Sequence, residues 1–174
     1  MIEALISSKT RINLLLKFFL NPERTAYLRG LAEEFGESTN SIRLELNKFE
    51  KAGMLDTSFS GNRKIFKVNQ EHPLFNDIRS IVFKFVGIDK LIEDLVKRLG
   101  NLEKVYITGD FAKGKNGDIL DILIVGEIDQ SYLLRLIEKV EKQIKKRIRY
   151  LIYTVEKFKF DYVKNENAVL IWNK

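Results

Sequence analysis

The sequence predicts an α+β protein with two domains, and three patterns along the chain lead to that prediction. Apolar residues recur at helical spacing through the first third of the chain, and two strand-like runs around a turn follow them. From Lys104 onward the pattern changes to buried strands and one long amphipathic helix. We expect a domain of three helices and a hairpin over residues 1–70, a helical connector over 71–99, and a small α/β domain with a mixed sheet over 100–174.

Three helices are predicted for the first domain. The first runs from Lys9 to Leu20 and ends before Pro22, because the residue before a proline avoids the α region. The second begins with Thr25 as its N-cap and stops at Gly36, and Ser38 caps the third. Two strands, 55–59 and 64–68, are expected to flank the turn over residues 60–63.

This order of helix, turn, helix and hairpin is typical of a winged helix-turn-helix, whose second motif helix enters the DNA major groove. Ile42, Leu46 and Phe49 form an apolar stripe on the third helix, so its opposite face is polar. Arginine can bond guanine, asparagine can bond adenine, and serine, threonine and lysine suit phosphates. The residues predicted to contact DNA are Ser38, Thr39, Asn40, Ser41, Arg43, Asn47, Lys48, Arg63 and Lys64.

The segment from Lys9 to Val68 resembles the winged-helix domains of ArsR-type and MarR-type regulators. In those domains a Ser/Thr-rich recognition helix is followed by a Glu-Lys-Ala-Gly turn, which this chain has from Glu50 to Gly53. The resemblance implies double-stranded DNA as a partner. A homodimer is expected, because one recognition helix covers only a half-site, and the apolar stretch from Leu74 to Val86 is the expected dimer contact. The alternatives are a polar face that only meets water, or an adaptor that binds another protein.

A second motif lies in the α/β domain. The run Gly109-Asp-Phe-Ala-Lys-Gly114, a short loop, and Asp118-Ile-Leu-Asp121 resemble the signature of minimal nucleotidyltransferases. That signature is Gly-Ser-x-Ala-x-Gly, a short loop, and Asp-x-Asp on a buried strand. Two carboxylates at i and i+2 project to the same side of a strand and hold Mg²⁺ on the nucleotide phosphates. A third acid on a neighbouring strand helps to hold the second metal ion.

The match to this signature is partial. Asp110 replaces the serine, Ile119 replaces the first carboxylate, and Asp118 is three residues from Asp121 and so leaves the shared face. The strand over 149–154, expected to supply the third acid, contains none. The remnant of the nucleotide site is therefore Gly109, Asp110, Gly114 and Asp121. We expect an inactive domain that dimerises or senses a ligand, with no catalytic residue, metal or cofactor; an active nucleotidyltransferase is the alternative.

Composition limits the remaining classes of function. The 174 residues carry a formal net charge of +6, which favours polyanionic partners. With one histidine and no cysteine, disulfides, a structural zinc site and a histidine-based catalytic triad are excluded. Apolar runs near the start are shorter than the ~20 residues that span a bilayer, so the cytoplasm is expected. The sequence thus predicts a cytoplasmic DNA-binding transcriptional regulator that is not an enzyme.

Overall fold

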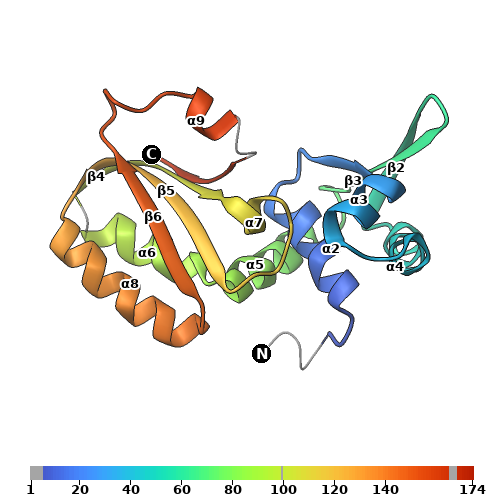
Figure 1. Cartoon of the computed structure of the whole chain (residues 1–174), viewed down its shortest axis with the longest axis horizontal. Coiled ribbons are helices and arrows are strands. Elements are labelled where there is room, and N and C mark those ends of the chain that lie inside the picture. The colour runs from blue at the N-terminus through green and yellow to red at the C-terminus, as the bar shows by residue number, and fades with distance from the viewer. Residues whose placement is uncertain (1–5, 99, 165–167) are drawn as a thin grey trace. The chain divides into compact units, whose positions relative to one another are not determined.

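The computed structural model describes residues 6–98, 100–164 and 168–174 (Figure 1). The chain forms two compact units, Met1–Val82 and Phe83–Lys174. Each unit has its own sheet: a three-stranded sheet of order β1-β3-β2 in the first, and a four-stranded sheet of order β6-β5-β4-β7 in the second. The predicted mixed α+β class is therefore confirmed.

The first unit consists of helices with a small antiparallel sheet. Ser8 caps the first helix by accepting a hydrogen bond from the Arg11 amide at 3.2 Å, and Ser38 caps another by accepting from the Ser41 amide at 3.1 Å. Gly36 ends the intervening helix in the left-handed conformation, with φ of 64°. The elements are α2 (Lys9–Leu20), β1 (Thr25–Tyr27), α3 (Leu28–Phe35), α4 (Thr39–Lys51), β2 (Leu55–Ser60) and β3 (Arg63–Val68).

The prediction that Thr25 caps the second helix is wrong. Thr25 begins β1, which pairs antiparallel with β3 and sets Thr25 opposite Lys67 and Tyr27 opposite Ile65. The helix α3 begins only at Leu28. A strand of three residues is held by its partner strand, so it leaves almost no periodic signal in its own sequence.

The core of the first unit lies between α2, α3 and α4. The stripe predicted on α4, made of Ile42, Leu46 and Phe49, is buried. Lys17 of α2 is also buried, and its ammonium group bonds to both carboxylate oxygens of Glu34 at 2.6 and 2.5 Å. Because an isolated buried charge is strongly disfavoured, this ion pair ties α2 to α3.

The second unit is built on a mixed sheet. β4 pairs antiparallel with both β5 and β7, whereas β5 and β6 are parallel. The boundary between the two units lies within α5. The elements are α5 (Phe75–Val86), α6 (Ile88–Arg98), β4 (Gly100–Thr108), α7 (Gly109–Ala112), β5 (Ile119–Ile128), α8 (Gln130–Ile144), β6 (Arg147–Tyr153), α9 (Asp161–Lys164) and β7 (Val169–Asn173). Leu99, the last residue of the predicted helical connector, lies outside the described residues.

The two faces of this sheet are covered differently. Leu120, Ile122 and Ile124 of β5 are buried on one face, and α6 and α8 lie together beside the sheet (Figure 1). Alternation along the strand turns Asp121, Leu123 and Val125 to the other face. There residues from 153–164 and Ala168 cover one part, through a cluster made of Tyr106, Leu123, Val125 and Val163 with Tyr153, Phe158 and Ala168 packed against it. The part around Asp121 lies outside that cluster.

Among the described residues, no helix is both long enough and apolar enough to cross a membrane.

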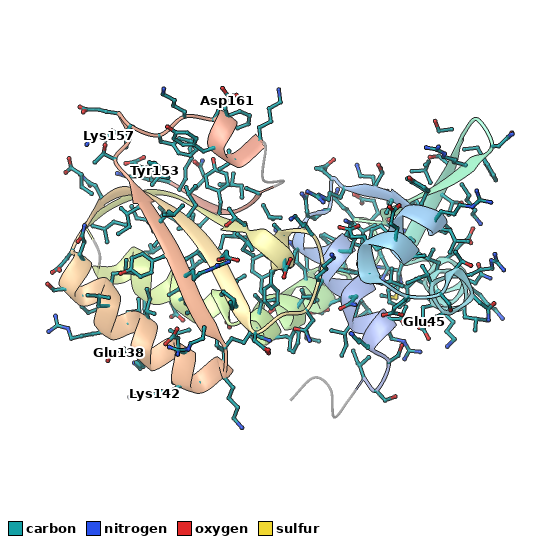
Figure 2. The ribbon with its side chains drawn as sticks, viewed as in Figure 1. Glu45, Glu138, Lys142, Tyr153, Lys157 and Asp161 are labelled. Atoms are coloured by element: carbon teal, nitrogen blue, oxygen red, sulfur yellow. The ribbon has the colours of Figure 1, made fainter. Side chains whose placement is uncertain are left out.

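Glu45 on α4 (Figure 2) forms an ion-pair network that fastens α2 to α4. Its carboxylate accepts bonds from Arg11 Nε at 2.8 Å, from Arg11 Nη2 at 3.2 Å and from Lys48 Nζ at 2.9 Å. The Glu45 side chain is only 9% exposed. The hydrogen bond from Arg11 is the main cause that lowers the pKa of Glu45 below its ordinary value of 4.5.

We expect Glu45→Gln to lower the free energy of unfolding by about 1 kcal/mol at neutral pH, because it removes the charged hydrogen bonds to Arg11. A lowered folded-state pKa makes this contribution fully present above pH 4.5 and lost as the pH falls through that lower pKa. Urea unfolding followed by circular dichroism should therefore show the variant and the unmodified protein converging in acid. A difference that stays constant down to strongly acidic pH would contradict this assignment.

Candidate functional site

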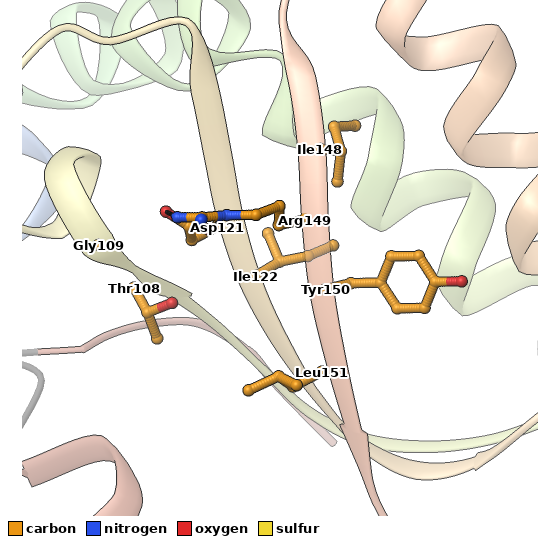
Figure 3. A pocket seen from close by; sticks show the side chains of 8 residues that line it. All are labelled: Thr108, Gly109, Asp121, Ile122, Ile148, Arg149, Tyr150 and Leu151. Atoms are coloured by element: carbon orange, nitrogen blue, oxygen red, sulfur yellow. Dashed lines mark hydrogen bonds and ion pairs between the residues drawn. The ribbon is translucent and has the colours of Figure 1, made fainter.

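A pocket of about 480 Å³ opens on the part of the four-stranded sheet around Asp121 (Figure 3). The end of β4 and the turn after it contribute Thr108 and Gly109, and β5 contributes Asp121 and Ile122. The edge strand β6 contributes residues 148–151. The side chains of Asp121 and Arg149 meet in front of the strands, and the ring of Tyr150 points away from them (Figure 3).

An ion pair between Asp121 and Arg149 is the main polar feature of the pocket. The two residues are register partners across the parallel pair β5–β6. Arg149 donates from Nε to Oδ1 at 2.6 Å and from Nη2 to Oδ2 at 3.0 Å, so the contact is bidentate. The Asp121 side chain is 17% exposed and that of Arg149 is 69% exposed, so the guanidinium lies on the solvent side of the carboxylate. The hydrogen bond from Arg149 to Asp121 is the main cause that raises the pKa of Arg149, and the charge of Asp110 adds to it.

Gly109 is the residue that makes room for this carboxylate. Its φ is +64°, a left-handed conformation that side chains rarely adopt. A Cβ atom at this position would overlap Oδ2 of Asp121. The motif glycine therefore serves both the turn into α7 and the close approach of Asp121.

The structure brings together only part of the predicted nucleotide-site remnant. Gly109 and Asp121 line the pocket, and Asp110 is close enough for its charge to act on Arg149. Gly114 is buried in the turn after α7, where its amide donates to the Phe111 carbonyl at 3.0 Å. Ile119, two residues before Asp121 on β5, is exposed. It occupies the place that the signature gives to the first carboxylate.

Arg149 was not among the predicted site residues, because its strand was examined for a third acid and the basic run 145–149 was assigned to the end of a helix. The residue type was visible, but its meaning depends on which β5 residue it faces. A parallel pairing between strands separated by a long helix leaves no local sequence signal. An arginine beside the Asp-x-Asp position on a predicted edge strand is the signal that could have found it.

The described residues do not fit the two-metal centre that the signature implies. No group of three or more His, Cys, Asp and Glu side chains in the described part of the chain is placed to hold a metal ion. Both oxygens of Asp121 are already bonded to Arg149. We therefore assign no chemical step to a bound metal.

The residues predicted to contact DNA are spread over α4 and the β2–β3 hairpin. On α4, Ser38, Thr39, Asn40, Arg43, Asn47 and Lys48 are exposed and Ser41 is partly exposed. Lys48 is paired with Glu45 at 2.9 Å and Lys64 with Glu50 at 2.6 Å. Arg63 lies over the Tyr27 ring at 5.0 Å. DNA contact by these residues stays a prediction, as does a homodimer through the segment 74–86, where Leu74 and Ile81 are exposed.

No protein-family model and no curated protein matches the chain. Three solved structures are similar to part of it. AF1382 from Archaeoglobus fulgidus is 19% identical, with 47% of this chain and 93% of that chain covered and a TM-score of 0.38. A mutant of the toxin–antitoxin MntA-HpeT is 15% identical, with 49% and 72% covered and a TM-score of 0.39. A toxin–antitoxin with AMP-PNP is 15% identical, with 49% and 73% covered and a TM-score of 0.39.

These comparisons correct the predicted function. Two of the similar structures are toxin–antitoxin structures, one of them with AMP-PNP, and none is described as a regulator. The prediction of a DNA-binding transcriptional regulator that is not an enzyme is therefore wrong. Its physical weakness was that it counted only carboxylates and overlooked the cation beside Asp121. Because the likeness is partial, the function of this chain is argued below from its own pocket.

We expect Gly109→Ala to lower the free energy of unfolding by about 3 kcal/mol, because backbone strain is added to the overlap with Asp121. Gly61→Ala is the matched control, since Gly61 has a similar φ of +57° but open space around it. That control should cost only about 1 kcal/mol. Equal losses in urea unfolding of the two variants would show that Asp121 does not press on Gly109.

Proposed function

We propose that the chain is a minimal nucleotidyltransferase whose pocket, over Asp121 and Arg149, binds a nucleoside triphosphate. The observation that carries this proposal is the Asp121–Arg149 pair beside the Gly109 turn. In the signature that this segment resembles, the glycine turn and the carboxylate strand meet at the triphosphate. The pocket has the same two components, with an exposed arginine added to them.

Arg149 is suited to bind phosphate while it stays paired with Asp121. A guanidinium has five N–H donors. Two of them are directed at Asp121, so three remain for a ligand. The side chain is 69% exposed, so a ligand can reach it from solvent. Its planar fork matches the spacing of two phosphate oxygens.

The strand β6 continues from this cation into apolar surface. Arg149, Leu151 and Tyr153 occupy every second position of the strand, so their side chains point to the same side. Successive residues of this row are about 6.6 Å apart. Leu151 lines the pocket and is 58% exposed, and Tyr153 stacks on Tyr162 with 5.1 Å between ring centroids. A charged end followed by an apolar end suits a nucleotide, whose phosphates would lie at Arg149 and whose base would lie toward Leu151.

The reaction proposed is nucleotidyl transfer. A hydroxyl oxygen of the acceptor attacks the α-phosphorus and forms a new P–O bond, while the bond to the pyrophosphate oxygen breaks and the hydroxyl proton passes to water. Negative charge increases on the leaving pyrophosphate. Arg149, hydrogen-bonded to the triphosphate, stabilises that charge.

We further infer that the first unit is a winged helix-turn-helix. The order of α2, β1, α3, α4 and the β2–β3 hairpin, with β1 paired to β3, supports this assignment. This assignment describes the fold of the first unit and assigns it no function.

The main test is the substitution Arg149→Ala. We expect it to weaken the binding of nucleoside triphosphates by about 10- to 100-fold, because charge-assisted hydrogen bonds to phosphate are lost. Isothermal titration calorimetry of the full chain with ATP, GTP, CTP and UTP measures this. Transfer of an α-³²P-labelled nucleotide to acceptors in a cell extract should fall in parallel. Arg135→Ala is the control, because Arg135 is an exposed arginine on α8, outside this pocket. The proposal fails if none of the four nucleotides binds at millimolar concentration.

A second substitution tests the direction in which the nucleotide lies. Leu151→Ser should weaken the binding of a nucleoside triphosphate by about 5-fold through lost apolar contact, with no change for inorganic triphosphate. Val155→Ser is the control, because Val155 is 59% exposed, much like Leu151 at 58%, but does not line the pocket. Competition calorimetry with the two ligands makes the comparison. Equal weakening of both ligands would place the base elsewhere.

A further inference from the structure

Arg149 lies where the resemblance places a metal ion. In the signature, carboxylates at i and i+2 of the strand hold Mg²⁺ against the nucleotide phosphates. Here the first of these positions is Ile119, whose hydrocarbon side chain cannot coordinate a cation. The second is Asp121, and both of its oxygens accept hydrogen bonds from Arg149, at 2.6 and 3.0 Å.

A magnesium ion would bind poorly at such a carboxylate. Mg²⁺ requires near-octahedral oxygen ligands and releases its water reluctantly. To reach Asp121 it would have to displace a bidentate guanidinium, and the neighbouring Ile119 offers no oxygen in return. A second carboxylate, that of Asp110, is close enough for its charge to act on Arg149.

We infer that Arg149 replaces the metal ion as the cation that joins Asp121 to the triphosphate, so that the pocket binds nucleotides without a divalent metal. One edge of the guanidinium, Nε and Nη2, holds Asp121. The other edge, formed by Nη1 and Nη2, presents two N–H groups to phosphate oxygens. Arg147, two residues earlier on β6, is exposed opposite Ile119 and lies outside this pocket, so Arg149 is the cation that meets Asp121. This inference rests on the proposed function.

Two substitutions have opposite effects under the two arrangements. Where a metal ion is held, Asp121→Asn removes a metal ligand and weakens nucleotide binding, and Arg149→Ala frees Asp121 for the ion. Where Arg149 is the cation, Arg149→Ala removes binding. Asp121→Asn then tightens it by about 3-fold, because the arginine loses its counter-charge and faces phosphate alone.

The experiment is calorimetry of the full chain with ATP, first in EDTA and then in excess magnesium chloride. We expect dissociation constants within about 3-fold of each other in the two buffers, with the two variants ordered as above. Binding that appears only with magnesium, or that strengthens by more than about 10-fold, overturns this inference and leaves the proposed function standing. No binding in either buffer overturns the proposed function as well.

Arg149→Lys completes the series, because lysine keeps the charge but loses the planar fork. Its affinity in EDTA should fall between those of the unmodified protein and Arg149→Ala. Circular dichroism and thermal unfolding of each variant verify that the second unit is folded. A lysine variant that binds no better than the alanine variant, while folded, would count against a phosphate contact by this side chain.

Discussion

The register of the parallel pair β5–β6 is the constraint on which the pocket depends. It sets Asp121 directly beside Arg149 and turns both toward the same side of the sheet. Because side chains alternate along a strand, a shift of one residue would turn Arg149 to the other face, where α6 and α8 pack. The helix α8, which joins the two strands, is anchored by its buried side chains Leu133, Leu136, Ile137 and Val140.

The open face around Asp121 has a second structural cause. Tyr153, Phe158, Val163 and Ala168 pack with Tyr106, Leu123 and Val125, so the sheet is covered only from those residues onward. Thr108 and Asp121 lie two residues further along the paired strands β4 and β5 and line the pocket. The place where the cover ends thus defines the pocket as much as the residues that line it.

Much of the fold could be predicted from the periodicity of apolar residues. The features that could not be predicted share one physical cause, which is their dependence on contacts with distant parts of the chain. The stripe of Ile42, Leu46 and Phe49 is local, so the helix and its buried face were visible in the sequence. The strand β1 is held by β3, about forty residues away, and left no periodic trace. The same holds for Arg149, whose partner lies across a parallel pairing. Gly109 and Asp121 were recognisable because they are close together in the sequence. The ion pair between Asp121 and Arg149 was not recognisable.

The two arginines of β6 also bear on how this sheet stays separate from other sheets. β6 is an edge strand, so one row of its backbone amides and carbonyls has no partner strand in the four-stranded sheet. Such edges recruit strands from other molecules, and charged side chains are a common protection against that association. A second copy aligned antiparallel along β6 would bring Arg147 and Arg149 toward their own counterparts. The charged residues of this edge, the pocket residue Arg149 among them, therefore also guard the chain against edge-to-edge aggregation.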